Sequence, residues 1–249
     1  MAAAAGAAAC GGSEPTPRAA VGDLVGAVPA PPHPALPIGA PVALGRDRDS
    51  TRWAPLRRAV VARARPSPDA PSVSALAART PEGTTNLVLV LARARDARGG
   101  LWIRARLPSR RAATGWLPRA ALGGYRVVHT RLVVDRGRLR MTLLRRGRAV
   151  LRAPIAIGRA GTPTPAGSFY VRDRLTRFAG RAYGPIAFGT SAQSATLTDW
   201  PAGGFVGIHG TDQPELIPGR VSHGCIRLRN VDILRLVRLL PVGTPLQIT

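Results

Sequence analysis

Two histidines and one cysteine gather in a short stretch near the end of this sequence. His209, His223 and Cys225 fall within 17 residues, whereas the whole chain of 249 residues holds four His and two Cys. A thiol needs a neighbouring base or positive charge to ionise near neutral pH, because free cysteine has a pKa of roughly 8.5. Histidine is the usual partner. The residue types therefore favour nucleophilic thiol chemistry at Cys225, with either histidine as the base.

The chain around Cys225 reads Ser-His-Gly-Cys-Ile-Arg, from Ser222 to Arg227. If this segment is extended, His223 and Cys225 are two residues apart and point to the same side of a strand. Gly224 between them lets a substrate approach the backbone closely, because it carries no side chain. Such an extended segment would present His223 and Cys225 to one substrate.

A second histidine motif, Ile-His-Gly-Thr, ends at Thr211, and twelve residues separate His209 from Ser222. This motif, followed by a loop and then Ser-His-Gly-Cys-Ile-Arg, resembles the signature of the L,D-transpeptidase (YkuD-type) catalytic domain. The Pro/Gly-rich stretch 162–169 is similar to an earlier motif of that family, and the resemblance extends over residues 131–249. Arg227 stands where many members carry Asn, and Arg is a common variant there.

The resemblance implies a role for most residues of the two motifs. Cys225 is the nucleophile and His209 is its base, with the imidazole held by a backbone carbonyl near Gly210 in place of a triad aspartate. His223 and Gly224 shape the pocket and, with the Cys225 N–H, help to form an oxyanion hole.

Ser222 and Arg227 complete the implied site, where they orient the loop or contact the carboxylates of a peptidoglycan stem peptide. In the family reaction the thiolate attacks the carbonyl of the third residue of a tetrapeptide stem and expels D-Ala. The side-chain amine of a second stem then captures the thioester and gives a 3→3 cross-link, whereas water as acceptor gives carboxypeptidase activity. The resemblance implies no metal and no organic cofactor. It implies carbapenems as inhibitors, because they mimic the acyl donor.

Other interpretations of the same residues stay open. A zinc site could use His209, His223 and Cys225, although their spacing is unlike the paired Cys-x-x-Cys patterns of structural zinc. Cys225 could also be an inert buried thiol. A papain-like protease is disfavoured because its cysteine precedes its histidine in the chain, and a sortase-like transpeptidase lacks the Ser-His-Gly-Cys motif. From a different class, a non-catalytic basic protein that binds cell wall or nucleic acid would rest on charge alone.

The charge of the chain is extreme, at a formal +23, and all 36 basic residues are arginine. An Arg-only composition that is rich in Ala and Pro is typical of a very GC-rich genome, so codon bias explains much of it. The resulting field nevertheless draws the protein toward acidic polymers. Because the charge is spread along the chain, without the exposed aromatics or recognised fold of a nucleic-acid module, we expect no nucleic-acid partner.

The elements that must position the site are mainly β-strands. Arg-Gly-Arg turns at 136–138 and 146–148 predict two hairpins. One helix is predicted from Asn230, as its N-cap, to Leu240. We expect an L,D-transpeptidase β-sandwich or barrel over 131–249 with this single helix in its C-terminal region. The strands are predicted at 132–135, 139–144, 149–157, 169–171, 185–188, 205–208 and 246–248.

Residues 53–122 form short strands broken by turn residues, which predicts a small β-barrel or sandwich. The pattern Leu-Trp-Ile-Arg, a loop and Gly-Trp-Leu-Pro resembles the bacterial SH3-like wall-targeting module, which implies contact with wall glycan or polymer. A structural domain without a ligand is the alternative. Trp102, Trp116 and Trp200 could stack on glycan rings, but packing inside the protein is the simpler interpretation. The strands are predicted at 59–64, 86–92, 101–107 and 115–118.

Residues 1–41 predict export rather than a fold. Small residues before Cys10, followed by Gly-Gly-Ser, resemble the end of a bacterial lipoprotein signal, although the basic start of such a signal is missing. The run to Pro41 is rich in proline and predicts a semi-rigid linker. We expect an extracytoplasmic protein of the cell envelope, in the periplasm or cell wall, with Cys10 as the candidate lipid anchor.

Overall fold

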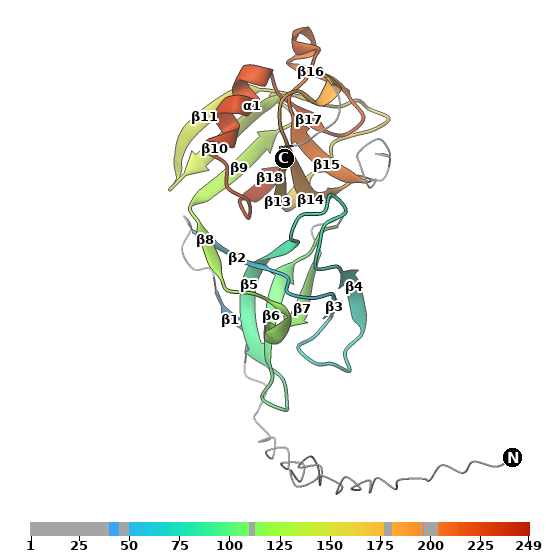
Figure 1. Cartoon of the computed structure of the whole chain (residues 1–249), viewed down its shortest axis with the longest axis vertical. Helices are drawn as coiled ribbons and strands as arrows, with labels where there is room; N and C mark the ends of the chain where they lie inside the picture. The colour runs from blue at the N-terminus through green and yellow to red at the C-terminus, as the bar shows by residue number, and fades with distance from the viewer. Residues whose placement is uncertain (1–39, 45–49, 110–112, 177–180, 195, 197–203) are drawn as a thin grey trace, which may run out of the picture. The chain divides into compact units, whose positions relative to one another are not determined.

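The computed structural model describes residues 40–44, 50–109, 113–176, 181–194, 196 and 204–249. The predicted anchor at Cys10, the linker before Ala40 and Trp200 lie outside these residues. The described chain is mostly β-structure with one α-helix (Figure 1), which confirms the expectation of a mainly β fold. No helix among the described residues is long and apolar enough to cross a bilayer.

The first eight strands form one antiparallel sheet, here called the N-terminal sheet. Its order is β4-β3-β7-β6-β5-β2-β8, and β1 pairs with β5. The strands are β1 (Val42–Ala43), β2 (Thr51–Pro55), β3 (Val60–Arg63), β4 (Ser72–Leu76), β5 (Leu87–Arg95), β6 (Leu101–Arg106), β7 (Thr114–Pro118) and β8 (Arg126–Val128).

Strand β6 shows why this sheet forms. Ile103, Ala105 and Leu107 alternate along the chain and are fully buried in the core of the sheet, as their period of two predicts. Trp102 and Trp116 are also buried, at 5% and 7% exposure, and pack in one cluster. These two indoles therefore pack inside the protein, as the simpler interpretation expects. The SH3-like identity of residues 53–122 and the domain boundaries stay predictions.

The remaining strands form a second sheet of ten strands, here called the C-terminal sheet, in the order β11-β10-β9-β18-β13-β14-β15-β17-β12-β16. Three neighbouring pairs are parallel: β9 with β18, β15 with β17, and β12 with β16. The strands are β9 (Thr130–Asp135), β10 (Arg140–Arg145), β11 (Arg148–Pro154), β12 (Ala156–Gly158), β13 (Gly167–Leu175), β14 (Ala187–Gln193), β15 (Phe205–His209), β16 (Gly219–Ser222), β17 (Ile226–Arg227) and β18 (Pro245–Ile248).

The two predicted hairpins are present, because β9 pairs with β10 and β10 pairs with β11 in antiparallel register. The single strand predicted over 149–157 is wrong. The structure divides it at Ile155 into β11 and β12, and β12 pairs with β16 and β17 instead of β10. Pro154 closes β11 because proline has no N–H to donate to a further ladder bond. This break brings β12 beside the strands that carry the candidate site.

The helix α1 (Asn230–Val237) is shorter than predicted, and the predicted cap is wrong. The N-cap position is Arg229, which makes no side-chain capping bond. Asn230 instead accepts a hydrogen bond from the Thr211 N–H through Oδ1, at 2.9 Å. Ile233 and Leu236 are fully buried in the core of the C-terminal sheet. The apolar face predicted from the period of three is only partly right, because Ile233 and Leu236 are buried but Val231 and Leu234 are exposed. The asparagine serves a different segment.

Candidate active site

The thiol of Cys225 lies against the backbone of β15. Strands β15 and β17 run parallel, with Ile208 opposite Ile226. The Gly207 N–H donates a hydrogen bond to Cys225 Sγ at 3.3 Å. Gly207 has no side chain, so the sulfur can approach this N–H closely. A hydrogen bond to sulfur favours the thiolate over the thiol, because it stabilises the charged form.

His209 follows two residues after Gly207 on the same strand, so both lie on one side of the pleat. The ring is 2% exposed, and its Nδ1 lies 2.6 Å from the carbonyl oxygen of Gly210. A carbonyl oxygen only accepts, so Nδ1 carries the proton and Nε2 is the basic nitrogen of the neutral ring. The carbonyl expected near Gly210 is therefore in contact with the histidine.

Apolar and aromatic side chains surround the thiol and the imidazole. Cys225 is 6% exposed and packs with Leu175 and Ala187, and with the partly buried Tyr183 and Phe205. The Tyr183 ring meets the His209 ring edge-on, with centroids 4.8 Å apart and planes at 60°. Sequence reasoning missed both aromatics because no local motif marks them. Their effect is to exclude water from the thiol and to limit the rotation of the imidazole.

The segment Ser222–Arg227 is not one continuous extended strand. β16 ends at Ser222, β17 begins at Ile226, and Gly224 between them has φ +125°. His223 is exposed, whereas Cys225 is buried. The condition under which both side chains would point to one side of a strand is therefore not met, because Gly224 turns the chain through a conformation that other residues rarely adopt.

Ser222 holds this turn through one hydroxyl group. Its Oγ donates to the Cys225 carbonyl at 2.6 Å and accepts from the Gly224 N–H at 3.1 Å. The side chain is 1% exposed, so water does not compete for these bonds. Of the two roles expected for Ser222, its contacts support orientation of the loop.

The Thr-Pro-Thr motif closes the turn from the other side. Thr162 Oγ1 donates to the Ser222 carbonyl at 3.0 Å, and Thr164 Oγ1 donates to the Gly224 carbonyl at 2.8 Å. Thr164 Oγ1 also accepts the Gly158 N–H at 2.9 Å. The sequence identified the motif but not this function. Two threonines separated by one residue match two carbonyls separated by one residue, and that spacing was the available signal.

Arg227 lies opposite His209 in the register of β15 and β17. It is half-buried, and its Nε is the one buried side-chain nitrogen or oxygen without a hydrogen-bond partner among the residues with described positions. A buried N–H without a partner is uncommon in proteins and calls for an explanation. Its place beside the histidine makes it a candidate contact for an acceptor group on the substrate.

The zinc alternative finds no support in this geometry. Within the described parts of the chain, which include His209, His223 and Cys225, no group of three His, Cys, Asp or Glu residues is placed to hold a metal ion. The exposed position of His223 and the buried position of Cys225 agree with this result.

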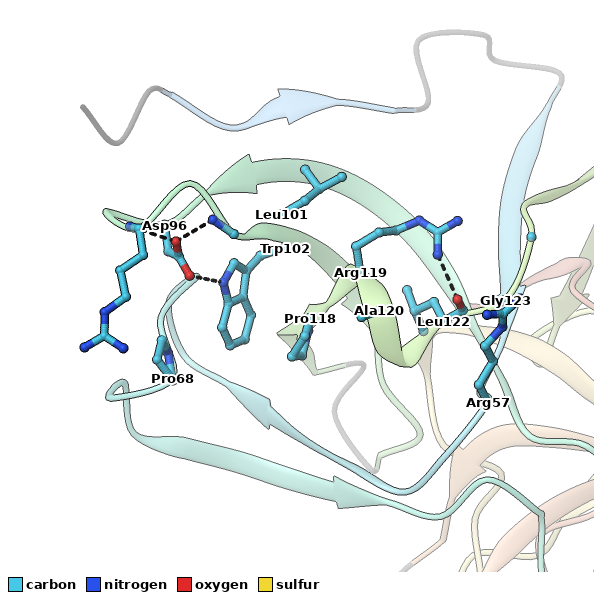
Figure 2. A pocket seen from close by; sticks show the side chains of 13 residues that line it. Arg57, Pro68, Asp96, Leu101, Trp102, Pro118, Arg119, Ala120, Leu122 and Gly123 are labelled. Carbon is cyan, nitrogen blue, oxygen red and sulfur yellow. Dashed lines mark hydrogen bonds between the residues drawn. The ribbon is translucent and has the colours of Figure 1, made fainter. Parts of the chain in front are cut away.

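A separate cavity of about 710 Å³ lies in the N-terminal sheet, away from the thiol (Figure 2). Arg57, Arg98 and Arg119 line it, together with apolar side chains. Asp96 also borders the cavity, but its carboxylate already accepts the Trp102 indole N–H and the backbone N–H groups of Arg98 and Gly100. The groups that this cavity offers to a ligand are therefore mainly cationic.

Comparison with known families settles the nature of the C-terminal sheet. Residues 129–248 match the family model for YkuD, the L,D-transpeptidase catalytic domain. Residues 129–248 form a YkuD-type L,D-transpeptidase catalytic domain. The resemblance that the two histidine motifs carry is thereby confirmed.

Curated relatives of the YkuD-type domain carry the same family name. The chain is 35% identical over 113 residues to the putative L,D-transpeptidase YkuD of Bacillus subtilis, a match that covers 45% of this chain and 62% of the relative. It is 33% identical over 138 residues to the probable L,D-transpeptidase YbiS of Escherichia coli K12, covering 48% and 44%. The chain thus spans less than two thirds of the length of these relatives.

Solved structures similar to the YkuD-type domain include the catalytic domain of the Enterococcus faecium L,D-transpeptidase acylated by ertapenem. That match has 28% identity and a TM-score of 0.37, and covers 48% of this chain and 96% of the other. The L,D-transpeptidase from Mycobacterium smegmatis matches with 16% identity and a TM-score of 0.41, covering 66% and 90%.

Proposed function

We propose that this protein is a cysteine-dependent L,D-transpeptidase that forms 3→3 cross-links between peptidoglycan stem peptides. The observation that carries the proposal is that one strand, β15, meets both groups: the Gly207 N–H donates to the buried Cys225 sulfur, and His209, two residues further on, has its Nδ1 held by the Gly210 carbonyl. This arrangement leaves Nε2 of His209 as the base and Cys225 Sγ as the nucleophile. The Gly207 N–H and the Gly210 carbonyl hold the sulfur and the imidazole in place.

The reaction begins when His209 takes the thiol proton. Cys225 Sγ then attacks the carbonyl carbon of the third stem residue, and the bond to D-Ala breaks as the imidazolium gives its proton to the leaving amine. The side-chain amine of a second stem attacks the thioester, its proton passes to His209, and the C–S bond breaks. Water in place of the amine gives carboxypeptidase activity as a side reaction.

The oxyanion of each tetrahedral intermediate requires N–H donors. The Gly224 N–H donates to Ser222 Oγ and so serves the turn. We assign the oxyanion contact at this turn to the Cys225 N–H, as the resemblance to the family implies. His223 is exposed at the mouth of the turn, where it shapes the pocket. Arg227 Nε supplies a donor for a stem carboxylate.

The test is mass spectrometry of purified muropeptides before and after incubation with the protein. We expect loss of tetrapeptide, release of D-Ala and formation of a dimer linked through two third residues. Cys225→Ala should give none of these products. Unchanged muropeptides with the wild-type protein, or products that persist in Cys225→Ala, would contradict the proposal. Retention on DNA columns that weakens with salt, without any reaction, would favour the non-catalytic basic binder.

We further propose that the protein acts outside the cytoplasm, with Cys10 as a lipid anchor, and that its N-terminal sheet contacts anionic wall polymer. The cavity lined by Arg57, Arg98 and Arg119 supports the second part. Sedimentation with purified sacculi should fall in the double variant Arg57→Gln/Arg98→Gln. The exposed pair Arg148→Gln/Arg152→Gln removes the same charge from the C-terminal sheet and should bind like wild type. An equal loss of binding in both double variants would show a general charge effect.

The lipid anchor is tested by fatty-acid labelling of the protein. Labelling that is unchanged in Cys10→Ala would overturn the assignment of Cys10 as the anchor.

A further inference from the structure

One peptide group connects the catalytic histidine to the start of helix α1. Its carbonyl belongs to Gly210 and lies 2.6 Å from His209 Nδ1. Its N–H belongs to Thr211 and donates to Asn230 Oδ1 at 2.9 Å. The C=O and N–H of a trans peptide point in opposite directions. A bond that fixes the N–H end therefore also fixes the direction in which the carbonyl meets the imidazole.

Close packing shows that the asparagine oxygen is built into this turn. A Cβ atom added to Gly210 would lie 2.2 Å from Asn230 Oδ1, and one added to Gly184 would lie 2.4 Å from it. The amide oxygen thus occupies the space that side chains would need at both glycines. Gly184 follows Tyr183, whose ring contacts His209 edge-on. One oxygen atom therefore touches the segments that hold the imidazole on two sides.

Asn230 is presented to this turn by a rigid support. It is the first residue of α1, and Ile233 and Leu236 of that helix are fully buried. The neighbouring Arg229 donates to the Ile217 carbonyl at 3.1 Å, which ties the start of the helix to another loop. The Asn230 Oδ1 accepts from Thr211, which lies outside the helix. The side chain therefore serves the histidine turn.

We propose that Asn230 is a positioning residue for His209, and this inference rests on the proposed function. The hydrogen bonds run from His209 Nδ1–H to the Gly210 carbonyl, and from the Thr211 N–H to Asn230 Oδ1. Hydrogen bonds in such a chain polarise one another, so the asparagine makes the Gly210 carbonyl a better acceptor. This matters most when His209 takes the thiol proton and becomes an imidazolium. The asparagine and the peptide together do the orienting work that a triad carboxylate does elsewhere.

Three variants separate this role from a structural one. Asn230→Leu keeps a similar shape but removes the acceptor, Asn230→Asp keeps an acceptor oxygen, and Val231→Ala changes an exposed side chain on the same turn of helix. Two rates are measured on each: acylation by ertapenem, and alkylation of Cys225 by iodoacetamide. The third readout is the ¹⁵N-edited NMR signal of His209 Nδ1–H, assigned by its loss in His209→Gln.

We expect Asn230→Leu to slow both reactions about tenfold, as the loss of roughly one hydrogen bond predicts, and to shift the Nδ1–H signal. Asn230→Asp should stay within about twofold of wild type, and Val231→Ala should be unchanged. Three results would overturn the inference: wild-type rates in Asn230→Leu, an unmoved Nδ1–H signal in that variant, or an equal loss of both rates in Asn230→Asp. Should Asn230→Leu not fold, Asn230→Ala and Asn230→Asp give the same comparison. Absence of an ertapenem adduct in wild type would count against the proposed function alone, because alkylation and NMR still report on Asn230 and His209.

Discussion

In the described part of residues 50–128, three polar residues are buried as a whole, Thr80, Asn86 and Asp96, and the side chain of Glu82 is also buried. In the described part of residues 129–249, the buried polar side chains are Thr130, Thr164, Arg172, Asp173, Thr190, Ser191, Ser194, His209, Thr211, Ser222, Asp232 and Thr244. Buried polar groups weaken a fold unless they are hydrogen-bonded. The two sheets therefore invite a comparison of what these groups do.

In the N-terminal sheet, Asp96 closes the turn between β5 and β6 and accepts the Trp102 indole. These contacts stabilise that turn, and all of them are with residues of the turn or the start of β6. In the C-terminal sheet, Ser222 and Thr164 hold the backbone on either side of Cys225. The difference is that Asp96 holds a local turn in the N-terminal sheet, whereas Ser222 and Thr164 hold the backbone of the candidate site in the C-terminal sheet. Variants in the two sheets should accordingly affect different measurements.

The largest effect is expected at the base. His209→Gln should slow acylation of Cys225 by about 10²–10⁴-fold, the loss expected for a missing general base. The comparison variant is His223→Ala, because His223 is exposed on the turn that precedes Cys225, and it should have a milder effect. Stopped-flow acylation by ertapenem provides the rates. A larger loss in His223→Ala than in His209→Gln would reverse the assignment of the base.

A buried ion pair joins the two sheets. It tests how much stability a buried charged pair contributes compared with an exposed one. Arg172 Nη2 lies 2.6 Å from Glu82 Oε2, with side chains 1% and 4% exposed, and the guanidinium stacks 3.9 Å from the Phe205 ring. Glu82→Gln should lower the free energy of unfolding by about 3 kcal/mol, because it leaves a buried charge with less compensation. Arg138→Gln removes the exposed pair with Asp135 and should cost about 0–1 kcal/mol. Equal losses in urea denaturation would show that burial does not strengthen the Arg172 pair.

The third effect tests the threonine clamp. Thr164→Val keeps the shape of the side chain but leaves the Gly158 N–H and the Gly224 carbonyl without a partner. We expect a loss of about 1–3 kcal/mol in stability and about tenfold slower acylation, because the Gly224–Cys225 peptide is no longer fixed. Thermal unfolding and acylation rates are measured together. A loss of stability with unchanged acylation, or slower acylation without any loss of stability, would separate the clamp from the thiol and contradict its assigned function.

The smallest effect is expected in the N-terminal sheet. Burial opposes ionisation of Asp96, but hydrogen bonds from Trp102, Gly100 and Arg98 outweigh it and lower the pKa of this carboxyl. A lowered folded-state pKa gives stability that is present above the unfolded pKa of about 3.9 and is lost as pH falls through the folded value. Asp96→Asn should therefore cost about 1–2 kcal/mol at pH 7, with a gap that narrows below about pH 4. Urea denaturation at several pH values measures this gap. Acylation slowed in step with this loss would contradict the separation of the two sheets.

The sequence carries much of this account where the signal is local. Alternation along β6 predicts its buried face, two Arg-Gly-Arg turns predict the hairpins, and the motif around Cys225 predicts the family. The parts that the sequence does not predict depend on contacts between segments that lie far apart in the chain. Thr164 contacts Gly224 across 60 residues, and Asn230 reaches Thr211 across a parallel pairing of β15 and β17 that no local pattern shows. The same limit applies to Tyr183, which becomes a neighbour of His209 only in the fold.

The central claim is that Cys225 is the nucleophile, and acylation by ertapenem tests it most directly. The wild-type protein is incubated with ertapenem, its intact mass is measured, and the adduct is mapped by peptide digestion. We expect one adduct per chain, on the peptide that contains Ser222–Arg227, and none in Cys225→Ser. An adduct that persists in Cys225→Ser, or one that maps to any other residue, would contradict the account.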